Sequence, residues 1–315
     1  MRIYRHFDAI APEHKGGVIA IGNFDGVHRG HRAVIGEAGR IAKANAAPWG
    51  VLTFEPHPRT LFAPDTPPFR LTPFHLKSRL IEEMGVDFLI VQQFDLDFSR
   101  RSAESFVAEI LVGNLNASHI VSGFDFVFGH QRQGTAQFLE ARGKAQGFGT
   151  TSVGALTDET GEVVSSTRIR TYLAEGRPRD AARLLGRAFE IEGRVSGGDQ
   201  RGRTIGFPTA NLMLGGTQPP LFGVYAIRAG IETGETTVWH DGVANLGYRP
   251  TFGGMTPVLE THIFDFADDI YGKHLRVALV EFLRPERKFD GITALTEQIR
   301  KDSDQARALL ANEAK

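Results

Sequence analysis

The sequence has no cysteine among its 315 residues. Disulfide bonds, zinc sites built from thiolates and a cysteine nucleophile are therefore excluded. A chain without cysteine suits a reducing compartment, and we expect this protein to work in the cytoplasm. Its length is sufficient for two domains of ordinary size.

The sequence also lacks an excess of charge of either sign and a long apolar segment. Its 36 lysines and arginines and 37 acidic residues give a formal net charge of −1, so no broad basic field attracts nucleic acid or an anionic membrane. No apolar run approaches the roughly 20 residues that a membrane span needs. The first 17 residues contain no apolar signal core. We therefore expect neither nucleic acid nor a membrane among its partners.

The first half of the chain alternates short apolar runs with segments of helical spacing. Strands are predicted at 16–24, 49–54, 87–94 and 118–126, and helices at 30–47, 71–85, 102–113 and 134–147. This alternation predicts an α/β domain of Rossmann-like type, with a parallel sheet and helices on both faces. Ligands of such a sheet bind at the carboxyl ends of its strands.

The pattern changes near residue 189. Strand-like runs joined by turns rich in glycine and proline follow at 189–197, 223–231, 236–247, 259–266 and 274–284, and helical spacing returns only at 291–311. This order predicts a small antiparallel β-barrel domain with a C-terminal helix. Gly176 and Pro178 interrupt a helix at the seam between the two patterns, so we predict domains at 1–182 and 183–315.

Two histidines and three glycines crowd into the ten residues GNFDGVHRGH, from Gly22 to His31, between a predicted strand and a predicted helix. Gly22 and Gly26 let the backbone approach a ligand, and the first amides of the helix favour an anion. His28 and His31 add hydrogen-bond donors, so the segment predicts a phosphate site without the lysine of a P-loop. The spacing resembles the HxGH signature of the nucleotidylyltransferase superfamily, whose histidines hold nucleotide phosphates. The alternative is a pair of capping or surface histidines.

A second segment, SSTRIR, resembles the ISSTxxR motif of the same superfamily. The matching residues are Ser165, Ser166, Thr167 and Arg170. Ser166 or Thr167 can cap the helix that follows and open a second helix N-terminus toward phosphates. Arg170, one turn further, is a fixed donor to phosphate oxygens. The alternative is a capped surface helix with a solvated arginine.

The second half carries a different set of polar residues. The stretch GRVSGGDQRGRTIGFPTANL (193–212) is rich in glycine and basic, but a strand-like run follows it, so it is not a Walker loop. Thr209 and Asn211 face the same side of an extended chain. Their hydroxyl and amide oxygens suit a hard cation such as Mg2+ with its phosphates. The alternative for this segment is a plain turn. Further along the chain, the stretch PVLETHIFDF carries Glu260, a carboxylate that could serve a reaction or could be an ordinary exposed residue of a strand.

These residues, together with the stretches GVYA (223–226), GVANLGYRPTFGG (242–254) and LRPERKFDG (283–291), closely resemble riboflavin kinase. The resemblance implies that Thr209 and Asn211 hold Mg2+ and ATP phosphates. It also implies that Glu260 is the catalytic base.

Nearly the whole chain resembles the bacterial bifunctional riboflavin kinase/FMN adenylyltransferases, also called FAD synthetases. Such a protein carries a nucleotidyltransferase-type domain before the kinase domain, takes ATP, riboflavin and FMN as substrates, and uses Mg2+. The implied catalytic residues are Glu260, His28, His31 and Arg170. The implied ATP contacts are Gly22, Phe24, Asp25, Gly30, Ser165, Ser166, Thr167, Gly202 and Arg203. The implied flavin contacts are Pro56, His57 and Pro58 in TFEPHPR, and Asp125 and Phe128 in GFDFVFGHQRQG. Asp25 is also compatible with a plain turn or with an approach to Mg2+, and Arg201 is given no role. For the two flavin segments the alternative is aromatic residues of the core and an ordinary loop.

The two implied reactions need different chemistry. The 5′-hydroxyl of riboflavin is a poor nucleophile, so its phosphorylation needs a base, here Glu260. The phosphate of FMN is already anionic at neutral pH, so its adenylylation needs alignment and charge neutralisation instead. We therefore expect His28 and His31 to donate hydrogen bonds to phosphates and not to abstract a proton.

Two other functions are open. A riboflavin kinase whose first domain transfers a nucleotide to a different phosphate ester would carry the same HxGH and SSTxxR motifs. A flavin-binding regulatory protein without catalysis would not need this set of residues. The sequence also leaves the oligomeric state open, a transient homo-oligomer included.

Overall fold

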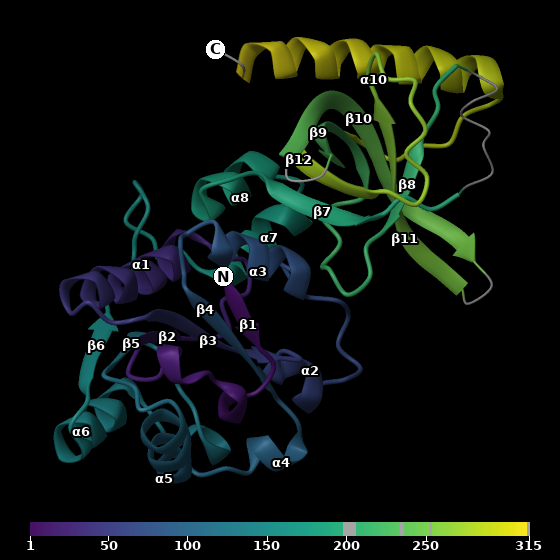
Figure 1. Cartoon of the computed structure of the whole chain (residues 1–315). Helices are drawn as coiled ribbons and strands as arrows, with labels where there is room; N and C mark the ends of the chain where they lie inside the picture. The colour runs from purple at the N-terminus through teal and green to yellow at the C-terminus, as the bar shows by residue number, and fades with distance from the viewer. Residues whose placement is uncertain (198–205, 234–235, 252–253, 314–315) are drawn as a thin grey trace. The chain divides into compact units, whose positions relative to one another are not determined.

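The chain folds into two compact units. The computed structural model describes residues 1–197, 206–233, 236–251 and 254–313 (Figure 1). Unit 1 comprises Met1–Pro67 and Thr72–Ser165, and unit 2 comprises Pro68–Leu71 and Ser166–Lys315. The units thus divide at Ser165/Ser166, upstream of the predicted functional boundary at 182/183, which stays a prediction.

Unit 1 is built on a six-stranded sheet in which every neighbouring pair is parallel, with the strand order β1-β4-β3-β2-β5-β6. Its strands are β1 (Arg2–Tyr4), β2 (Val18–Ile21), β3 (Trp49–Glu55), β4 (Phe88–Gln93), β5 (His119–Gly123) and β6 (Gly149–Val153). The predicted α/β fold is confirmed. The chain order reverses beside β2, because β3 and β4 lie on one side of it and β5 and β6 on the other. Such a switch point is where α/β sheets bind ligands, at the carboxyl end of the strands.

Helices and short turns cover both faces of this sheet. The α- and π-helical elements are α1 (Arg29–Ala44), α2 (Pro58–Phe62), α3 (Phe74–Glu82), α4 (Leu96–Ser99), α5 (Ala103–Ser105), η3 (Phe106–Asn114) and α6 (Ala136–Gln146). The short 3₁₀ turns are η1 (Phe7–Ala9), η2 (Pro12–His14) and η4 (His130–Arg132). The predicted α-helix at 102–113 is corrected in part, because Ser102 caps α5 as expected but the helix continues in the π form as η3.

Strand β2 shows how the sequence pattern builds the core. Val18 and Ala20 pack into the apolar layer that contains residues of α1 and α3, whereas Ile19 and Ile21 pack into the layer with η3 and α6. Successive side chains of a strand point to opposite faces, so a strand covered on both sides is a continuous apolar run. The burial of β2 therefore follows from its sequence.

Unit 2 is a curled antiparallel sheet with the strand order β7-β12-β9-β10-β11-β8. Its elements are α7 (Ser166–Ala174), α8 (Pro178–Leu185), β7 (Phe189–Arg194), β8 (Ala210–Met213), β9 (Gly223–Thr233), β10 (Thr236–Thr251), β11 (Gly254–Ile263), β12 (His274–Pro285) and α10 (Ile292–Glu313). Ser196, just after β7, bridges Asn211 of β8 and so joins the two edges of the sheet. The predicted antiparallel barrel is confirmed.

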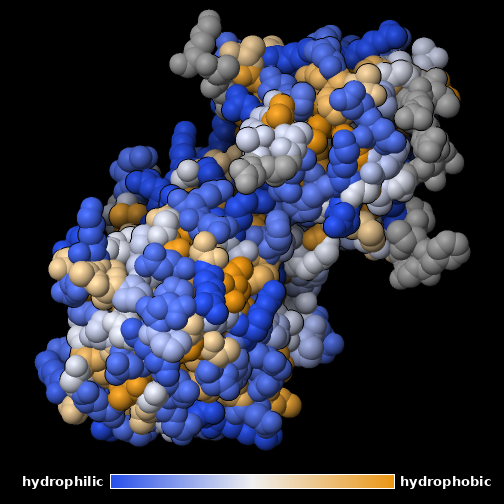
Figure 2. Space-filling view, viewed as in Figure 1, coloured by the Kyte–Doolittle hydropathy of each residue, from blue (hydrophilic) through white to orange (hydrophobic). Residues whose placement is uncertain are grey.

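The C-terminal helix closes the core of unit 2. Ala306 and Leu310 of α10 pack with Val224 and Ala226 of β9 in one buried cluster, and Figure 1 shows α10 crossing one end of the curled sheet. Among the described residues, no helix combines the length and the apolarity needed to cross a membrane. In Figure 2 the visible face of unit 1 is mainly hydrophilic, with small separated apolar areas.

His119 makes the stability of unit 1 sensitive to pH. Its Nε2 lies 2.8 Å from Oγ1 of Thr151, and burial lowers its pKa below 6.5, partly opposed by the carboxylate of Glu37. Below that pH the unfolded chain binds the proton first, so we expect the free energy of unfolding to decrease as pH falls from about 6.5 toward the lowered folded-state pKa and to be unaffected above 6.5. We expect His119→Gln to flatten this dependence. Urea unfolding at several pH values, followed by the fluorescence of Trp49 in a Trp239→Phe background, measures the pH dependence of the free energy of unfolding. The same pH dependence in His119→Gln and in the wild-type protein would contradict the role of His119.

Candidate active sites

The first candidate site begins with His28, the N-cap residue of α1. Its Nδ1 accepts a hydrogen bond from the amide of His31 at 3.2 Å, and the side chain is buried. Because Nδ1 accepts, the proton of the neutral ring lies on Nε2, which is then a donor. Capping and donation to a phosphate are therefore compatible roles for the two nitrogens of one ring.

The glycine between the two histidines makes room for their rings. The rings of His28 and His31 stack with centroids 3.6 Å apart and planes 18° apart, and Phe24 meets His31 edge-on at 5.5 Å. A Cβ at Gly30 would lie 3.1 Å from Cε1 of His28 and 3.6 Å from the carbonyl oxygen of Val164. Any larger residue would thus press on the ring of His28, whereas its Cβ would make an ordinary contact with Val164.

The loop between β2 and α1 holds a strained backbone. Phe24 and Val27 adopt left-handed conformations with φ of 49° and 42°, which a β-branched residue such as valine rarely does. Strain of this kind costs on the order of 1–3 kcal/mol and persists only where the surroundings impose it. Val27 is fully buried against Leu76 and Leu80 of α3. A Cβ at Gly22 would lie 2.9 Å from the ring of Phe24, so this glycine also fits the loop.

Asp25 ties the same loop to the segment before α3. Its Oδ1 accepts hydrogen bonds from the amide and the hydroxyl of Thr72 at 3.0 and 3.3 Å, and the amide of Gly26 donates to that hydroxyl at 2.9 Å. The side chain is buried. Of the roles that the sequence left open for Asp25, these contacts match a turn residue, and its contact with ATP stays a prediction.

The segment TFEPHPR continues from β3, which neighbours β2. The peptide bond between Glu55 and Pro56 is cis. His57 caps α2 through Nδ1, which accepts from the amide of Arg59 at 3.1 Å, and Pro58 is the first residue of that helix. The predicted flavin contacts Pro56, His57 and Pro58 thus form a tight turn at the carboxyl edge of the sheet.

The segment GFDFVFGHQRQG follows β5, on the other side of β2. Phe128 is only 7% exposed, and its ring packs against Phe106, Phe126 and Phe138. Phe124 is 52% exposed, and Asp125 is exposed beside it. The flavin contacts predicted for Phe128 and Asp125 stay predictions, and Phe124 is an accessible ring that sequence reasoning missed.

The structure brings these three segments together because β3, β2 and β5 are adjacent and parallel. Their carboxyl ends lie at one edge of the sheet, at the switch point. The SST motif is divided: Ser165 ends unit 1, whereas Ser166, Thr167 and Arg170 lie in α7 of unit 2. Since α7 begins at Ser166, the predicted capping residues lie in its first turn instead. Nε of Arg170 donates to the carbonyl oxygen of Phe69 at 2.8 Å within unit 2.

The second candidate site lies across three strands of unit 2. Glu260 of β11 is the direct register partner of Asn211 on β8 and of Asn245 on β10. Such partners share one face of a sheet, so the predicted base and the predicted metal ligand are neighbours. Nη2 of Arg249 lies 2.8 Å from Oε1 of Glu260, and both side chains are about one third exposed, at 32% and 30%.

Asn211 offers an oxygen suited to a cation. Its backbone oxygen accepts from the amide and hydroxyl of Ser196 at 3.0 and 3.1 Å. Its side chain is only 3% exposed, and among the residues that the structure describes Oδ1 has no hydrogen-bond partner. Buried polar atoms normally have partners, so an amide oxygen left this way fits a Mg2+ ligand. Thr209, half-buried, lies two residues before it.

A pocket of about 250 Å³ opens beside Thr209. The polar residues of its lining are Thr209, Thr261, Asp268 and Asp269. The rest is apolar or aromatic, with Val195, Ile263, Phe266, Ile270 and Tyr271 among the larger side chains. A pocket with apolar walls and few polar groups is typical of a small-molecule site. Gly202 and Arg203, the other predicted ATP contacts, lie outside the described residues, as does Arg201.

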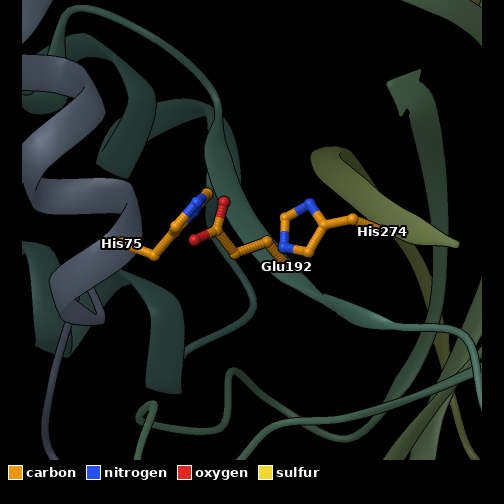
Figure 3. Close-up of side chains that lie close together, drawn as sticks. All are labelled: His75, Glu192 and His274. Atoms are coloured by element: carbon orange, nitrogen blue, oxygen red, sulfur yellow. The ribbon is translucent and has the colours of Figure 1, made fainter. Parts of the chain in front are cut away.

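A pair of side chains in unit 2 lies apart from these predictions. Glu192 of β7 and His274 of β12 lie on neighbouring strands, with ligand atoms within 4.8 Å of each other (Figure 3). Nδ1 of His274 also lies 3.3 Å from Oε1 of Glu232. His75 in the same view belongs to unit 1, whose position relative to unit 2 is not determined. The three side chains therefore define no metal site.

Known proteins match both halves of the chain. Residues 10–168 match the FAD synthetase family, and residues 185–310 match the riboflavin kinase family. A bifunctional riboflavin kinase/FMN adenylyltransferase of Escherichia coli strain K12 is 42% identical over 94% of this chain and 93% of that protein. This chain belongs to the bifunctional riboflavin kinase/FMN adenylyltransferase family.

Other members of the bifunctional family are similarly close. The relative from Bacillus subtilis strain 168 is 41% identical over 96% of this chain and 95% of its own length, and that from Pseudomonas fluorescens is 41% identical over 100% and 99%. A solved structure named a macrolide-efflux protein, from Streptococcus pneumoniae, has a TM-score of 0.84 and 32% identity over 97% of this chain and 98% of that one. The resemblance stated from the motifs is confirmed.

The structure adds to the two candidate sites several residues that the sequence motifs did not indicate. They are Thr72 and Lys77, which contact the loop after β2, Arg249, which pairs with Glu260, and the exposed ring of Phe124. One signal was present in the sequence, because Lys77 lies among the apolar residues Leu76, Leu80 and Ile81 of a helix. A lysine at such a position has to find buried partners.

Proposed function

We propose that this protein phosphorylates riboflavin to FMN with ATP and then adenylylates FMN with a second ATP, giving FAD and pyrophosphate. The kinase reaction belongs to the domain at 183–315 and the adenylylation to the domain at 1–182. One arrangement carries the proposal: in unit 2 the carboxylate of Glu260 stands opposite Asn211, while unit 1 stacks His28 on His31 at its own switch point. Two separate sites support two reactions.

In the kinase reaction Glu260 accepts the proton of the riboflavin 5′-hydroxyl as its oxygen attacks the γ-phosphorus of ATP and ADP leaves. Arg249 holds one carboxylate oxygen at 2.8 Å and so limits the orientations of Glu260. Thr209 and Asn211 would hold Mg2+, which would supply positive charge to the phosphates. The pocket beside Thr209 takes the base of ATP.

In the adenylylation reaction an oxygen of the FMN phosphate attacks the α-phosphorus of ATP, and pyrophosphate leaves. Nε2 of His28, the ring of His31 and the first amides of α1 donate to the charged oxygens. Arg170 adds a further donor. This reaction needs no general base, since the attacking phosphate is already ionised.

The assignment of Asn211 predicts a change in metal dependence. We expect Asn211→Ala to raise the Mg2+ concentration for half-maximal riboflavin phosphorylation by about 10- to 100-fold, because a ligand oxygen is lost. FMN adenylylation by the same sample should keep its Mg2+ dependence. Asn312→Ala, on the exposed side of α10, is the matched control. Magnesium titrations of both activities measure the effect, and equal curves for Asn211→Ala and the control would remove Asn211 as a ligand.

The partners in this proposal are small molecules only. Unit 2 offers a pocket of small-molecule size, and the whole chain has a formal net charge of −1. We propose no nucleic-acid or membrane partner and a place in the cytoplasm.

The test is to incubate the purified protein with riboflavin, ATP and Mg2+ and to separate the flavins by chromatography over time. FMN first and FAD later is the expected result. Formation of FMN without FAD would contradict the proposed adenylylation of FMN. It would favour the alternative that the first domain transfers a nucleotide to a different phosphate ester. If no product formed even from added FMN, the flavin-binding regulatory protein would be the better description.

A further inference from the structure

We propose that Lys77 is a positioning residue of the adenylylation site, because its ammonium group ties the loop from Gly22 to His28 to the end of β3. The inference rests on the proposed adenylylation of FMN. Lys77 lies on α3, and its side chain is 0% exposed. Lysine is among the residues least often fully buried, so its partners explain why it is there.

The described contacts of the ammonium group include three oxygens. Nζ lies 2.7 Å from Oε1 of Glu55, 3.0 Å from the carbonyl oxygen of Asn23 and 3.4 Å from Oγ1 of Thr53. The hydroxyl of Thr53 also donates to the carbonyl oxygen of Asn23 at 3.2 Å. A buried cation without such partners is strongly unfavourable, so these contacts hold one another in place. Lys77 thus joins the loop after β2 to the end of β3.

The same part of the chain holds the loop at two further points. Thr72 binds Asp25 and the amide of Gly26, as described above. Val27, with its left-handed backbone, is buried against α3. Residues 72–80 therefore form a platform that contacts the loop at Asn23, Asp25 and Val27 through a cation, a hydroxyl and an apolar surface.

This platform acts on catalysis through the histidines. The loop leads directly into His28, which caps α1 and stacks on His31. Donors stabilise developing charge only when they lie close to the position of the charged oxygens. A displacement of about 1 Å in such a group lowers a rate on the order of 100-fold. Lys77 is fully buried, so we assign it positioning through the loop and no contact with substrate.

The experiment compares Lys77→Met with Lys144→Met in the full-length protein. Lys144 also has a carboxylate oxygen at 2.7 Å, that of Glu140, but this pair is exposed on α6. We expect Lys77→Met to lower kcat for FMN adenylylation by about 10- to 100-fold, and Lys144→Met to leave it within about twofold. Riboflavin phosphorylation by the same samples should not change. Wild-type adenylylation by folded Lys77→Met would overturn the inference.

A double variant separates positioning from mere stability. Lys77→Met removes the cation that lies 2.7 Å from Glu55, and adding Glu55→Gln removes the charge of that carboxylate and should restore much of the lost thermal stability. If Lys77 positions the loop, adenylylation stays low in the double variant although its melting temperature recovers. Recovery of kcat in parallel with the melting temperature would show that Lys77 only balances the charge of Glu55, and the inference would be wrong.

Thr72 provides a second test that changes no charge. We expect Thr72→Val to lower adenylylation, because it loses the hydroxyl that binds Asp25 and Gly26, and Thr72→Ser to retain most of the activity. This pair decides the question if Lys77→Met does not fold, and equal activity of the two variants would overturn the platform. Failure of the proposed function can be distinguished from failure of this inference, since the wild-type protein itself would then form no FAD from FMN.

Discussion

Riboflavin phosphorylation by Glu260→Gln is expected to be slower than that by the wild-type protein by about 10²- to 10⁴-fold, the usual effect of removing a general base. The amide keeps the shape of the side chain but cannot take the proton of the 5′-hydroxyl. The ion pair of Glu260 with Arg249 is partly exposed, so its loss should change the free energy of unfolding by about 1 kcal/mol or less. Initial rates with saturating riboflavin and ATP, together with thermal unfolding, measure both effects.

Glu281→Gln is the matched control for this prediction. Glu281 also pairs with an arginine, Arg179, at 2.6 Å in unit 2, and its side chain is 28% exposed. It should keep riboflavin phosphorylation near the wild-type rate. Conversion of FMN to FAD should persist in Glu260→Gln, and its loss in a folded protein would argue against two separate sites. A normal kinase rate in Glu260→Gln would remove this residue as the base.

The second large effect is expected at the histidines. His31→Ala should lower FMN adenylylation by about 10²- to 10³-fold, because one donor to the charged phosphate oxygens is lost. His28 has two roles, since Nδ1 caps α1 and Nε2 is the donor. His28→Asn should keep the cap, which is worth about 1 kcal/mol, while losing the donor. We therefore expect slow adenylylation and near-normal stability for His28→Asn, measured by pyrophosphate release and thermal unfolding.

His6→Ala is the control for the histidine variants, because His6 is half-exposed and its described contacts are local, with Asp8 and the ring of Phe7. It should adenylylate FMN at the wild-type rate. Riboflavin phosphorylation should be normal in all three variants. Wild-type FAD formation by folded His31→Ala and His28→Asn would leave these histidines as capping and packing residues, the alternative that the sequence left open.

The sequence alone indicated most of unit 1 because its signals are local. The four buried residues of β2 and the helical spacing of α1 depend on period, which neighbouring residues set. Strands β1 and β6 did not stand out, since the first is three residues long and the second, GTTSV, is polar and lies at the edge of the sheet. Edge strands are buried on fewer sides and need fewer apolar residues.

Some residues of the candidate sites could likewise be predicted from local sequence signals, whereas others could not. The motifs indicated His28, His31, Thr209 and Asn211, because short spacing places their side chains at a helix start or on one side of a strand. The expectation that these residues bind phosphate or a metal ion followed from the chemistry of their side chains. The same reasoning did not separate Phe128 from Phe124, although one is 7% and the other 52% exposed, because alternation along an irregular loop does not predict burial.

The sequence by itself determined the family, the order of the two folds and the residue types available for phosphate and metal. The tertiary structure decided which distant residues meet. The pairing of Glu260 with Asn211 depends on the register of β11 against β8, and the burial of Lys77 depends on how α3 packs against β3 and the loop after β2. Register and packing arise from contacts between segments far apart in the chain, and no local period encodes them.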